Sequence, residues 1–224
     1  MIKIPFEVNN GIKNMQIDKD LLEDAIQKKT KEHIFRLYAW SPKCISLGRN
    51  QKVNFINTEV QKLYDIDIVR RLTGGRALLH DNELTYSYIC PISSLQHGDS
   101  IIESYKEILS HIFVEPFKKL GINLKIESRT PKNTDLNYCM QISTSADLCY
   151  NEKKLIGSAQ YRKENYLLQH GSILFNYDKI LLEKLFNEKI DETFITCMNE
   201  INPDISMLDV INLWSDFHDF WKTI

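Results

Sequence analysis

The amino-acid sequence predicts an α/β (α+β) fold in which helices pack on a mixed, mostly antiparallel sheet. Short strand-like segments follow one another through tight turns more often than through helical crossovers, an order typical of antiparallel pairing. Two longer segments instead repeat apolar residues at helical spacing. The 224 residues, 43% of them hydrophobic, suffice for a sizeable core. We therefore expect a single domain over residues 1–224, with a core at about 15–176 and a C-terminal helical segment at about 177–224.

In the first half of the chain, apolar periodicity and chain breakers define each element. Ile17, Leu21 and Ala25 share one face of a helix expected at 14–29. Ser41-Pro42 ends a strand, and the turn at 48–51 suits the rim of a pocket. The expected strands are Ile34–Trp40, Cys44–Leu47, Ile66–Arg70, Ala77–Leu79 and Leu84–Ile89, with a short helix at Thr58–Tyr64.

The second half begins with a long helix. Ser100 can cap it, Glu103 completes a capping box, and Gly121 ends it. A polar loop at 128–138 then delivers Cys139, and a hairpin is expected to turn at 151–153. The remaining expected elements are the strands Leu124–Ile126, Ala146–Tyr150, Lys154–Gln160 and Leu167–Phe175, and the helices Lys179–Glu188 and Met207–Trp221.

Composition argues against several classes of protein and partner. The net charge is -2 without long like-charge blocks, so no nucleic-acid partner is expected. No apolar run approaches the ~18 residues of a membrane span, and the N-terminus lacks the form of a signal peptide. We therefore expect a cytoplasmic protein without a membrane partner. The five cysteines are widely spaced and form no CxxC, so we expect reduced thiols and no metal site.

Cys139 and Lys154 are the residues whose types suggest catalysis. A thiol reacts as the thiolate, and a nearby ammonium group can lower its pKa from about 8.5 to roughly 3.5–7.5. A Cys–Lys pair beside a floor of small residues could therefore accept an acyl group as a thioester and pass it on. Cys149 is closer to Lys154 in sequence and is a rival nucleophile, although its apolar neighbours predict burial.

A glycine loop at 70–76 is a candidate for ligand binding. Gly74 and Gly75 let the backbone approach a ligand closely, and their amides can point at a carbonyl or phosphate. The flanking arginines could hold a polar or anionic end of the ligand. A tight turn with arginines in surface ion pairs is the competing interpretation. The loop matches neither GxGxxG nor GxxxxGK[ST], so no nucleotide fingerprint is present.

Three motifs resemble one known family: RRLTGGRALLHDNELTYS at 70–87, KLIGSAQYR at 154–162 and LQHGSIL at 168–174. Over about 15–176 the chain is similar to the biotin/lipoate protein ligase catalytic domain, and most of all to octanoyltransferases of the LipM type. The resemblance implies a class II synthetase/biotin-ligase-like fold, with Cys139 and Lys154 as catalytic residues. The candidate substrate-binding residues are Arg70, Arg71, Thr73, Gly74, Gly75, Arg76, His80, Gly157, Ser158, Ala159, His170 and Gly171.

Two activities of that family remain open. The octanoyltransferases move an octanoyl group from acyl carrier protein, through a cysteine thioester, to a lysine of a lipoyl carrier domain, and need no cofactor. The ATP-dependent lipoate–protein ligases activate a free acid with ATP and Mg²⁺ and need no thiol. Cys139 and the TSADL segment at 144–148 favour the transferase, whereas the form of 48–51 and Met140 keep the ligase open.

The transferase hypothesis predicts the partners of the enzyme. The octanoyl donor would be acyl carrier protein, and the acceptor would be a lipoyl carrier domain such as the glycine-cleavage H protein or a dehydrogenase E2. These encounters would be transient, and the enzyme itself is expected to be a monomer. The resemblance names no base for the proton of the acceptor lysine, and Leu72 and Leu78 are the candidates for the acyl slot.

Overall fold

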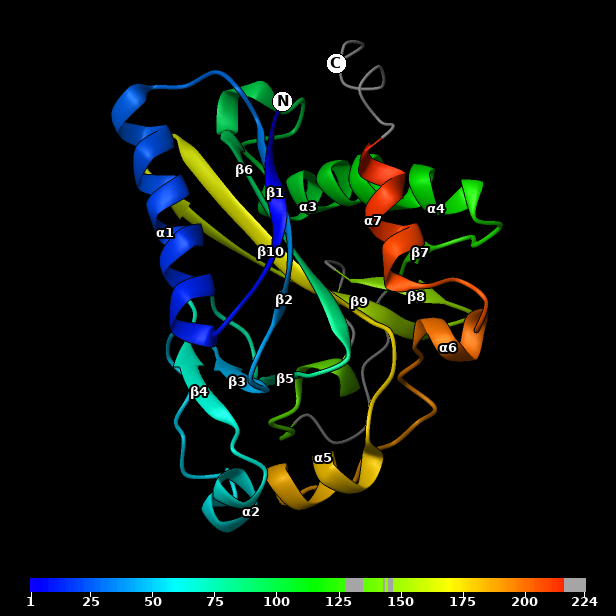
Figure 1. Ribbon diagram of the computed structural model, residues 1–224. Helices are drawn as coiled ribbons and strands as arrows, with labels where there is room; N and C mark the ends of the chain where they lie inside the picture. Colours follow the sequence, from blue (N-terminus) through cyan, green and yellow to red (C-terminus); the bar gives the residue numbers. More distant parts are fainter. Residues whose placement is uncertain (128–134, 143, 145–146, 216–224) are drawn as a thin grey trace.

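The computed structural model describes residues 1–127, 135–142, 144 and 147–215. Its strands form two sheets (Figure 1), one of seven strands in the order β1-β2-β6-β10-β9-β8-β7 and one of three in the order β4-β3-β5. Among the described strands, the β1–β2 and β3–β4 pairs are parallel and the other pairs are antiparallel. The predicted mixed, mostly antiparallel arrangement is confirmed, with the strands divided between two sheets.

The strands follow the predicted pattern closely, and several bounds agree to the residue. They are β1 (Ile2–Asn9), β2 (Ile34–Trp40), β3 (Cys44–Leu47), β4 (Asp67–Arg70), β5 (Leu78–His80), β6 (Glu83–Pro91), β7 (Lys125–Ile126), β8 (Leu148–Tyr150), β9 (Lys153–Lys163) and β10 (Tyr166–Leu174). The helices are α1 (Gly11–Lys28), α2 (Thr58–Leu63), α3 (Ile101–Leu109), α4 (Glu115–Lys119), α5 (Lys179–Phe186), α6 (Met198–Ile201) and α7 (Met207–Ser215).

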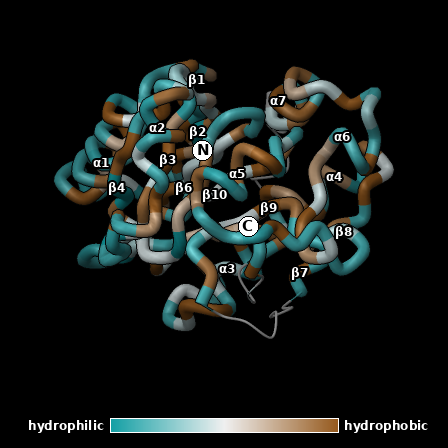
Figure 2. Tube along the Cα trace, turned by 90° about the horizontal axis from the view of Figure 1, so that it is seen from below, coloured by the Kyte–Doolittle hydropathy of each residue, from teal (hydrophilic) through white to brown (hydrophobic). Residues whose placement is uncertain are grey.

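Helices cover both faces of the large sheet. In Figure 2, seen from below, β6, β10 and β9 lie between α1 on one side and α4 and α6 on the other. The main hydrophobic core joins the sheet to α3, α4 and α7 through rings such as Tyr86, Phe113 and Trp214. A second core joins the small sheet to α5. The central strands β6 and β10 are buried along almost their whole length, including their polar residues.

Helix α1 is fixed to the sheet by polar groups as well as by apolar ones. Asn10 accepts the N–H of Lys13 at 2.9 Å, and this cap starts the helix three residues before the predicted position. Asp18, which is buried on the sheet-facing side, pairs with Arg36 of β2 at 2.9 Å and accepts the hydroxyl of Tyr38 at 2.8 Å. Burial works to raise the pKa of Asp18, but its hydrogen-bonded and charged partners outweigh burial and lower it.

Two differences from the predicted elements have plain causes. The edge strand β1 was not predicted, because Pro5 and polar residues interrupt its apolar pattern. The long helix predicted from Ser100 does begin there, with Ser100 accepting the N–H of Glu103 at 3.2 Å, but residues 110–114 widen into a π-helical turn before α4. Gly121 ends it with a φ of 74°.

Parts of three predicted segments lie outside the described residues: the loop at 128–134, residue 146 at the start of the strand predicted at 146–150, and the end of the last helix beyond Ser215. Helix α7 begins at Met207 as predicted. Among the described helices, none has both the length and the apolar character needed to cross a membrane.

Candidate active site

Cys139 lies at the start of a short helical turn, Cys139–Gln141, beside the glycine loop. Its N–H donates to the carbonyl oxygen of Ala77 at 2.8 Å, and the N–H of Ala77 donates to Asn137 at 3.0 Å. Its side chain is partly exposed, whereas the other four cysteines are buried, and all five are free thiols. A partly exposed thiol on a fixed backbone is accessible to a substrate.

Glu188, two residues beyond α5, holds the same loop from another side. Its Oε2 accepts the N–H of Asn137 at 2.8 Å, and its Oε1 accepts the N–H of Tyr138 at 2.9 Å. Oε1 also accepts the side-chain amide of Gln141 at 3.0 Å. One carboxylate from the C-terminal segment therefore fixes the residues on both sides of Cys139.

Lys154, in β9, directs its ammonium group at Cys139. Nζ lies 3.8 Å from Sγ of Cys139 and donates to the carbonyl oxygens of Cys139 at 3.1 Å and Ile142 at 2.8 Å. The Lys154 side chain is only 2% exposed. The cation therefore lies behind the partly exposed thiol, and the structure brings together the two residues that the sequence pointed to.

Asp147 balances the charge of Lys154. Its Oδ2 lies 3.1 Å from Nζ, and its oxygens also accept the backbone N–H groups of Thr144 at 2.7 Å and Ser158 at 3.1 Å. Burial works to lower the pKa of Lys154, but the charges of Asp147 and Cys139 outweigh burial, so the pKa is raised. Lys154 therefore remains an ammonium ion at neutral pH.

Gly157 leaves the space that the Lys154 side chain fills. A Cβ at Gly157 would lie 2.9 Å from Cε of Lys154 and 3.2 Å from its Nζ. The register with β8 shifts here: Leu148 pairs with Ile156, but the next residue pairs with Lys154. This irregularity redirects neighbouring side chains, as β-bulges do, and it lets Lys154 and Gly157 share one side of the strand.

A cavity of about 60 Å³ adjoins Cys139. Met15, Trp40 and Leu78 give it apolar walls that suit an alkyl chain, and Thr85 adds a hydroxyl group. Leu78 was one of the two leucines expected at such a slot, while Leu72 lies outside this lining. The predicted binding residues that line the cavity are Arg71, Gly75, Arg76, His80, Gly157, Ser158, Ala159, His170 and Gly171.

Arg71 organises the glycine loop from the inside. Its guanidinium donates to the carbonyl oxygens of Ser46 at 2.6 Å, Gly74 at 3.0 Å and Arg76 at 2.9 Å. Gly75 has a φ of 91°, a conformation that glycine adopts without strain. Burial lowers the pKa of Arg71, and the charge of Cys139 acts in the opposite direction. The arginine thus shapes the loop and also places a cation at the cavity wall.

Three predicted binding residues, Arg70, Thr73 and Gly74, do not line this cavity. Arg70 donates to the carbonyl oxygens of residues 48, 49 and 51 at 2.7, 3.1 and 2.8 Å, so its guanidinium holds that turn. Thr73 is buried and shares a 2.7 Å hydrogen bond with Nε2 of His170. Gly74 is exposed. Arg70 and Thr73 thus hold residues next to the cavity without lining it.

His80 lies in the cavity floor with both ring nitrogens engaged. Nε2 lies 2.7 Å from Oγ of Ser46 and Nδ1 lies 3.0 Å from Glu83, while the ring stacks on Trp40 at 3.9 Å. Burial lowers the pKa of His80, although Glu83 acts in the opposite direction. His80 therefore lines the cavity while both of its ring nitrogens are held by neighbouring side chains.

The rival nucleophile Cys149 does not face the cavity. It is 1% exposed in β8, and its Sγ points to the carbonyl oxygen of Glu127 at 3.8 Å.

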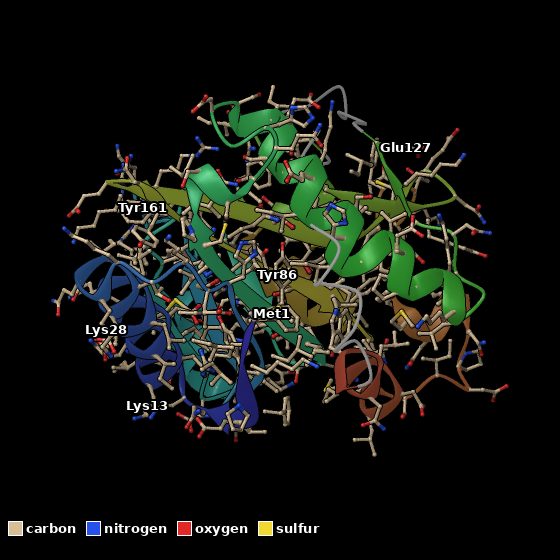
Figure 3. The ribbon with its side chains drawn as sticks, turned by 90° about the horizontal axis from the view of Figure 1, so that it is seen from above. Met1, Lys13, Lys28, Tyr86, Glu127 and Tyr161 are labelled. Atoms are coloured by element: carbon tan, nitrogen blue, oxygen red, sulfur yellow. The ribbon has the colours of Figure 1, made fainter. Side chains whose placement is uncertain are left out.

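Figure 3 labels Tyr86 near the centre of the molecule, where its hydroxyl lies 2.8 Å from Oγ of Ser158. Ser158 of the small-residue segment is thus held from behind by Tyr86 while it lines the cavity.

Asp147, Glu188 and Met15 are among the residues of this site that sequence reasoning missed. Asp147 stands within TSADL, so its proximity to Lys154 was a usable signal. Glu188 and Tyr138 are 50 positions apart in the chain, and no local sequence pattern predicts their hydrogen bond. Met15 belongs to an ordinary amphipathic helix, and only the packing of α1 against the sheet brings it to the cavity.

The chain is similar to proteins of known class. A family model described as the lipoyl protein ligase A/B catalytic domain matches residues 10–217. The octanoyltransferase LipM of Clostridioides difficile (strain 630) is 39% identical over 186 residues, which are 81% of this chain and 68% of the relative. LipM of Bacillus subtilis (strain 168) is 34% identical over 181 residues, 77% of this chain and 64% of the relative. The chain thus spans about two thirds of the length of these relatives.

Solved structures share the fold. The Plasmodium falciparum protein LipL1, in complex with lipoate, has a TM-score of 0.74 at 23% identity and covers 99% of this chain and 63% of its own. A lipoate-protein ligase A bound with ATP has a TM-score of 0.70 at 22% identity, covering 95% of this chain and 81% of its own. The biotin/lipoate ligase type of catalytic fold is therefore confirmed. The family match over residues 10–217 and the LipM relatives show that the chain belongs to the lipoyl protein ligase A/B catalytic domain family.

Proposed function

We propose that this chain is an acyltransferase that moves an octanoyl group to a lysine of a lipoyl carrier domain through a thioester on Cys139. The observation that carries the proposal is the partly exposed Cys139 thiol, 3.8 Å from the buried Lys154 ammonium, at a cavity with apolar walls. The LipM octanoyltransferases, at 34–39% identity, support the same activity. Acyl carrier protein is the proposed donor.

In the first half-reaction, the Cys139 thiolate attacks the thioester carbonyl of the donor. The Sγ–carbon bond forms, and the bond between that carbon and the donor sulfur breaks. The donor leaves as a thiolate and takes up the proton that Cys139 had released to solvent. Octanoyl-Cys139 conserves the energy of the thioester, so no nucleotide is needed, and we propose that the enzyme works without a cofactor.

Lys154 stabilises charge in both half-reactions. Its ammonium faces the sulfur and can also face the carbonyl oxygen on which negative charge develops. Removing one such donor in other enzymes costs about 2.7–4 kcal/mol of barrier. Because its pKa is raised, Lys154 is a poor proton acceptor at neutral pH, so it does not serve as the base for the incoming amine.

In the second half-reaction, the neutral ε-amine of the acceptor lysine attacks octanoyl-Cys139. The carbon–nitrogen bond forms as the carbon–Sγ bond breaks, and the amine loses one proton. The departing Cys139 sulfur can take up that proton, directly or through water, so atoms and charge balance without a separate base. The amide product and the free thiol return the enzyme to its starting state.

Several further expectations are part of the same proposal. A single catalytic domain, a cytoplasmic location and a monomeric state remain predictions that follow from sequence and family. Glu188 accepts hydrogen bonds from Asn137, Tyr138 and Gln141, on either side of Cys139, and the 194–196 segment exchanges backbone hydrogen bonds with Lys154. The segment after 176 is therefore proposed as part of the catalytic unit.

The choice of donor tests the proposal. Octanoyl-carrier protein alone should modify a lipoyl domain, and prior alkylation of Cys139 should abolish that transfer. Free octanoate or lipoate with ATP and Mg²⁺ is the matched arm of the experiment. If product forms only in that arm and survives alkylation, the chain is a lipoate–protein ligase and the proposal fails. The ligase activity is the alternative to test, because the solved structures that share this fold include a lipoate-protein ligase A.

A further inference from the structure

Two neighbouring cavities share a wall. The cavity beside Cys139 measures about 60 Å³, and a larger one of about 340 Å³ lies between α1 and β4. Met15 and His170 line both. Figure 1 shows α1 and β4 next to each other on one side of the molecule, away from β8 and β7. The boundary between the two spaces is therefore made of these two side chains.

His170 is the fixed part of that boundary. Its Nε2 lies 2.7 Å from Oγ1 of Thr73, and its Nδ1 lies 3.4 Å from Oδ2 of Asp18. Its residue exposure is 4%, and Asp18 is in turn paired with Arg36. A ring held at both nitrogens in a packed interior does not rotate without breaking two hydrogen bonds.

Met15 is the part that can move. A methionine side chain has three rotatable bonds and adapts to irregular spaces. The backbone that carries it is fixed, because the adjacent Asn14 is buried and donates to the carbonyl oxygens of Asn9 at 3.2 Å and Ala39 at 3.0 Å. Arg36 also donates to Asn14 at 2.6 Å. A change at this boundary therefore involves the Met15 side chain and not the helix.

The larger cavity offers an apolar path beyond Met15. Ile12, Val69, Leu72 and Leu168 contribute to its lining, and Lys19 is among its charged residues. Such walls suit the distal methylene groups of an alkyl chain. Two further cavities among the described residues, one beside Tyr166 and one beside Trp214, share no lining residue with the space beside Cys139.

We propose that Met15 sets the upper length of the acyl chain that the enzyme accepts, by separating the cavity beside Cys139 from the one between α1 and β4. An acyl chain that extends beyond the cavity beside Cys139 must displace Met15 before its distal carbons can enter the larger cavity. The inference rests on the proposed function and adds a specificity-determining residue to it.

The test is equilibrium binding of saturated free fatty acids of eight, ten and twelve carbons, measured by calorimetry. In the Met15→Ala protein the ratio of the Kd for the twelve-carbon acid to that for the eight-carbon acid should fall at least about tenfold relative to wild type. This follows because each newly buried methylene is worth about a fourfold gain in affinity. The Met15→Phe protein should change the ratio in the opposite direction.

Ile17→Ala is the matched control, because Ile17 is partly buried on the same helix and lies outside the lining of both cavities. Its ratio should equal that of wild type. An unchanged ratio in a folded Met15→Ala protein, or a Met15→Phe protein that favours the longer acids, overturns the proposal; if Met15→Ala does not fold, Met15→Phe decides alone. Because binding needs no turnover, absent transfer from octanoyl-carrier protein would instead count against the proposed function.

Discussion

At the scale of single residues, the site depends on which groups accept hydrogen bonds from the buried ammonium of Lys154. The ammonium of Lys154 has three protons, and its acceptors are the carbonyl oxygens of Cys139 and Ile142, the carboxylate of Asp147 and the Cys139 sulfur. Asp147 is thus a positioning residue that holds the ammonium in line with the sulfur. A buried ion pair needs such complete partnering, because an unpaired charge in the interior is costly.

Replacing Asp147 by Asn should expose this dependence. The substitution removes the charge that raises the pKa of Lys154, and burial, which lowers that pKa, then dominates. Octanoylation of Cys139 should slow about 10- to 100-fold, and the alkaline limit of its pH profile should move to lower pH. A stability loss of up to about 3–5 kcal/mol is also expected from breaking a buried pair.

Asp24→Asn is the matched control, since Asp24 forms a 2.6 Å ion pair with Lys28 on the exposed face of α1. Its pH profile should match wild type. A pH profile that is unchanged in a folded Asp147→Asn protein contradicts the role given to Asp147, whatever happens to the absolute rate.

The residue types at the site were readable from sequence, but their contacts were not. The Cys139–Lys154 pair was suggested by a polar thiol loop ahead of KLIGSAQ, and the structure places the two side chains in contact. Arg70 and Arg71 are neighbours in sequence with the same chemistry, yet Arg70 braces the 48–51 turn and Arg71 lines the cavity. Arg70 ends β4 and Arg71 follows it, and the two differ in the direction of their side chains, which tertiary packing sets.

At the scale of elements, the loop that carries Cys139 is held between the glycine loop and the segment after α5. On one side, Ala77 exchanges backbone hydrogen bonds with Asn137 and Cys139. On the other side, the Glu188 carboxylate accepts the backbone N–H groups of Asn137 and Tyr138. The sequence predicted a single domain with a core at about 15–176 and a C-terminal helical segment at about 177–224. Glu188 links that segment to the core, because this carboxylate, remote in sequence, completes the hydrogen bonding of an irregular loop.

The Glu188→Ala substitution should therefore make the loop that carries Cys139 less rigid. Two backbone N–H groups lose their carboxylate partner, so kcat/KM for octanoyl-carrier protein should fall about tenfold, and unfolding should become easier by about 1–3 kcal/mol. The rate of Cys139 alkylation should change as well, as measured by mass spectrometry on the folded protein.

Glu107→Ala supplies the comparison for this variant. Glu107 also accepts two successive backbone N–H groups, those of Gln96 and His97 at 2.9 Å each, but in a loop away from Cys139. It should lower stability similarly without altering Cys139 reactivity. Equal alkylation rates in wild-type and Glu188→Ala protein would show that Glu188 does not position the cysteine.

At the scale of the whole molecule, the burial of two histidine rings links the stability of the fold to pH. Burial lowers the pKa of His80 and of His33 below the usual 6.5. The unfolded chain therefore binds protons at a pH where the folded protein keeps these rings neutral. The stability they allow is fully present above about pH 6.5 and is lost as the pH falls through that value toward the lower folded pKa.

Unfolding by urea between pH 7.5 and 5 should show this loss. The free energy of unfolding should decrease below pH 6.5 by at most about 1.4 kcal/mol per pH unit for each histidine. His80→Gln should flatten the slope, whereas His97→Gln, at an exposed position, should not. A stability that rises as the pH falls from 6.5 to 5 would contradict the assignment.

The fold as a whole was predictable in kind but not in arrangement. Apolar periodicity located α1, β2, β3 and β10 closely, because local pattern and tertiary role agree there. The separation of β3, β4 and β5 into a second sheet depends on pairings such as Cys44 with His80, and no local pattern encodes those. The shared wall at Met15 likewise arises from docking α1 on both sheets.

The central claim is that Cys139 carries the acyl group, and intact mass spectrometry after incubation with octanoyl-carrier protein tests it most directly. Wild-type protein should gain one octanoyl group, lose it to hydroxylamine, and lose it to a lipoyl domain. Cys139→Ala should gain none and transfer none. A Cys139→Ala protein that modifies the lipoyl domain as fast as wild type would contradict the account.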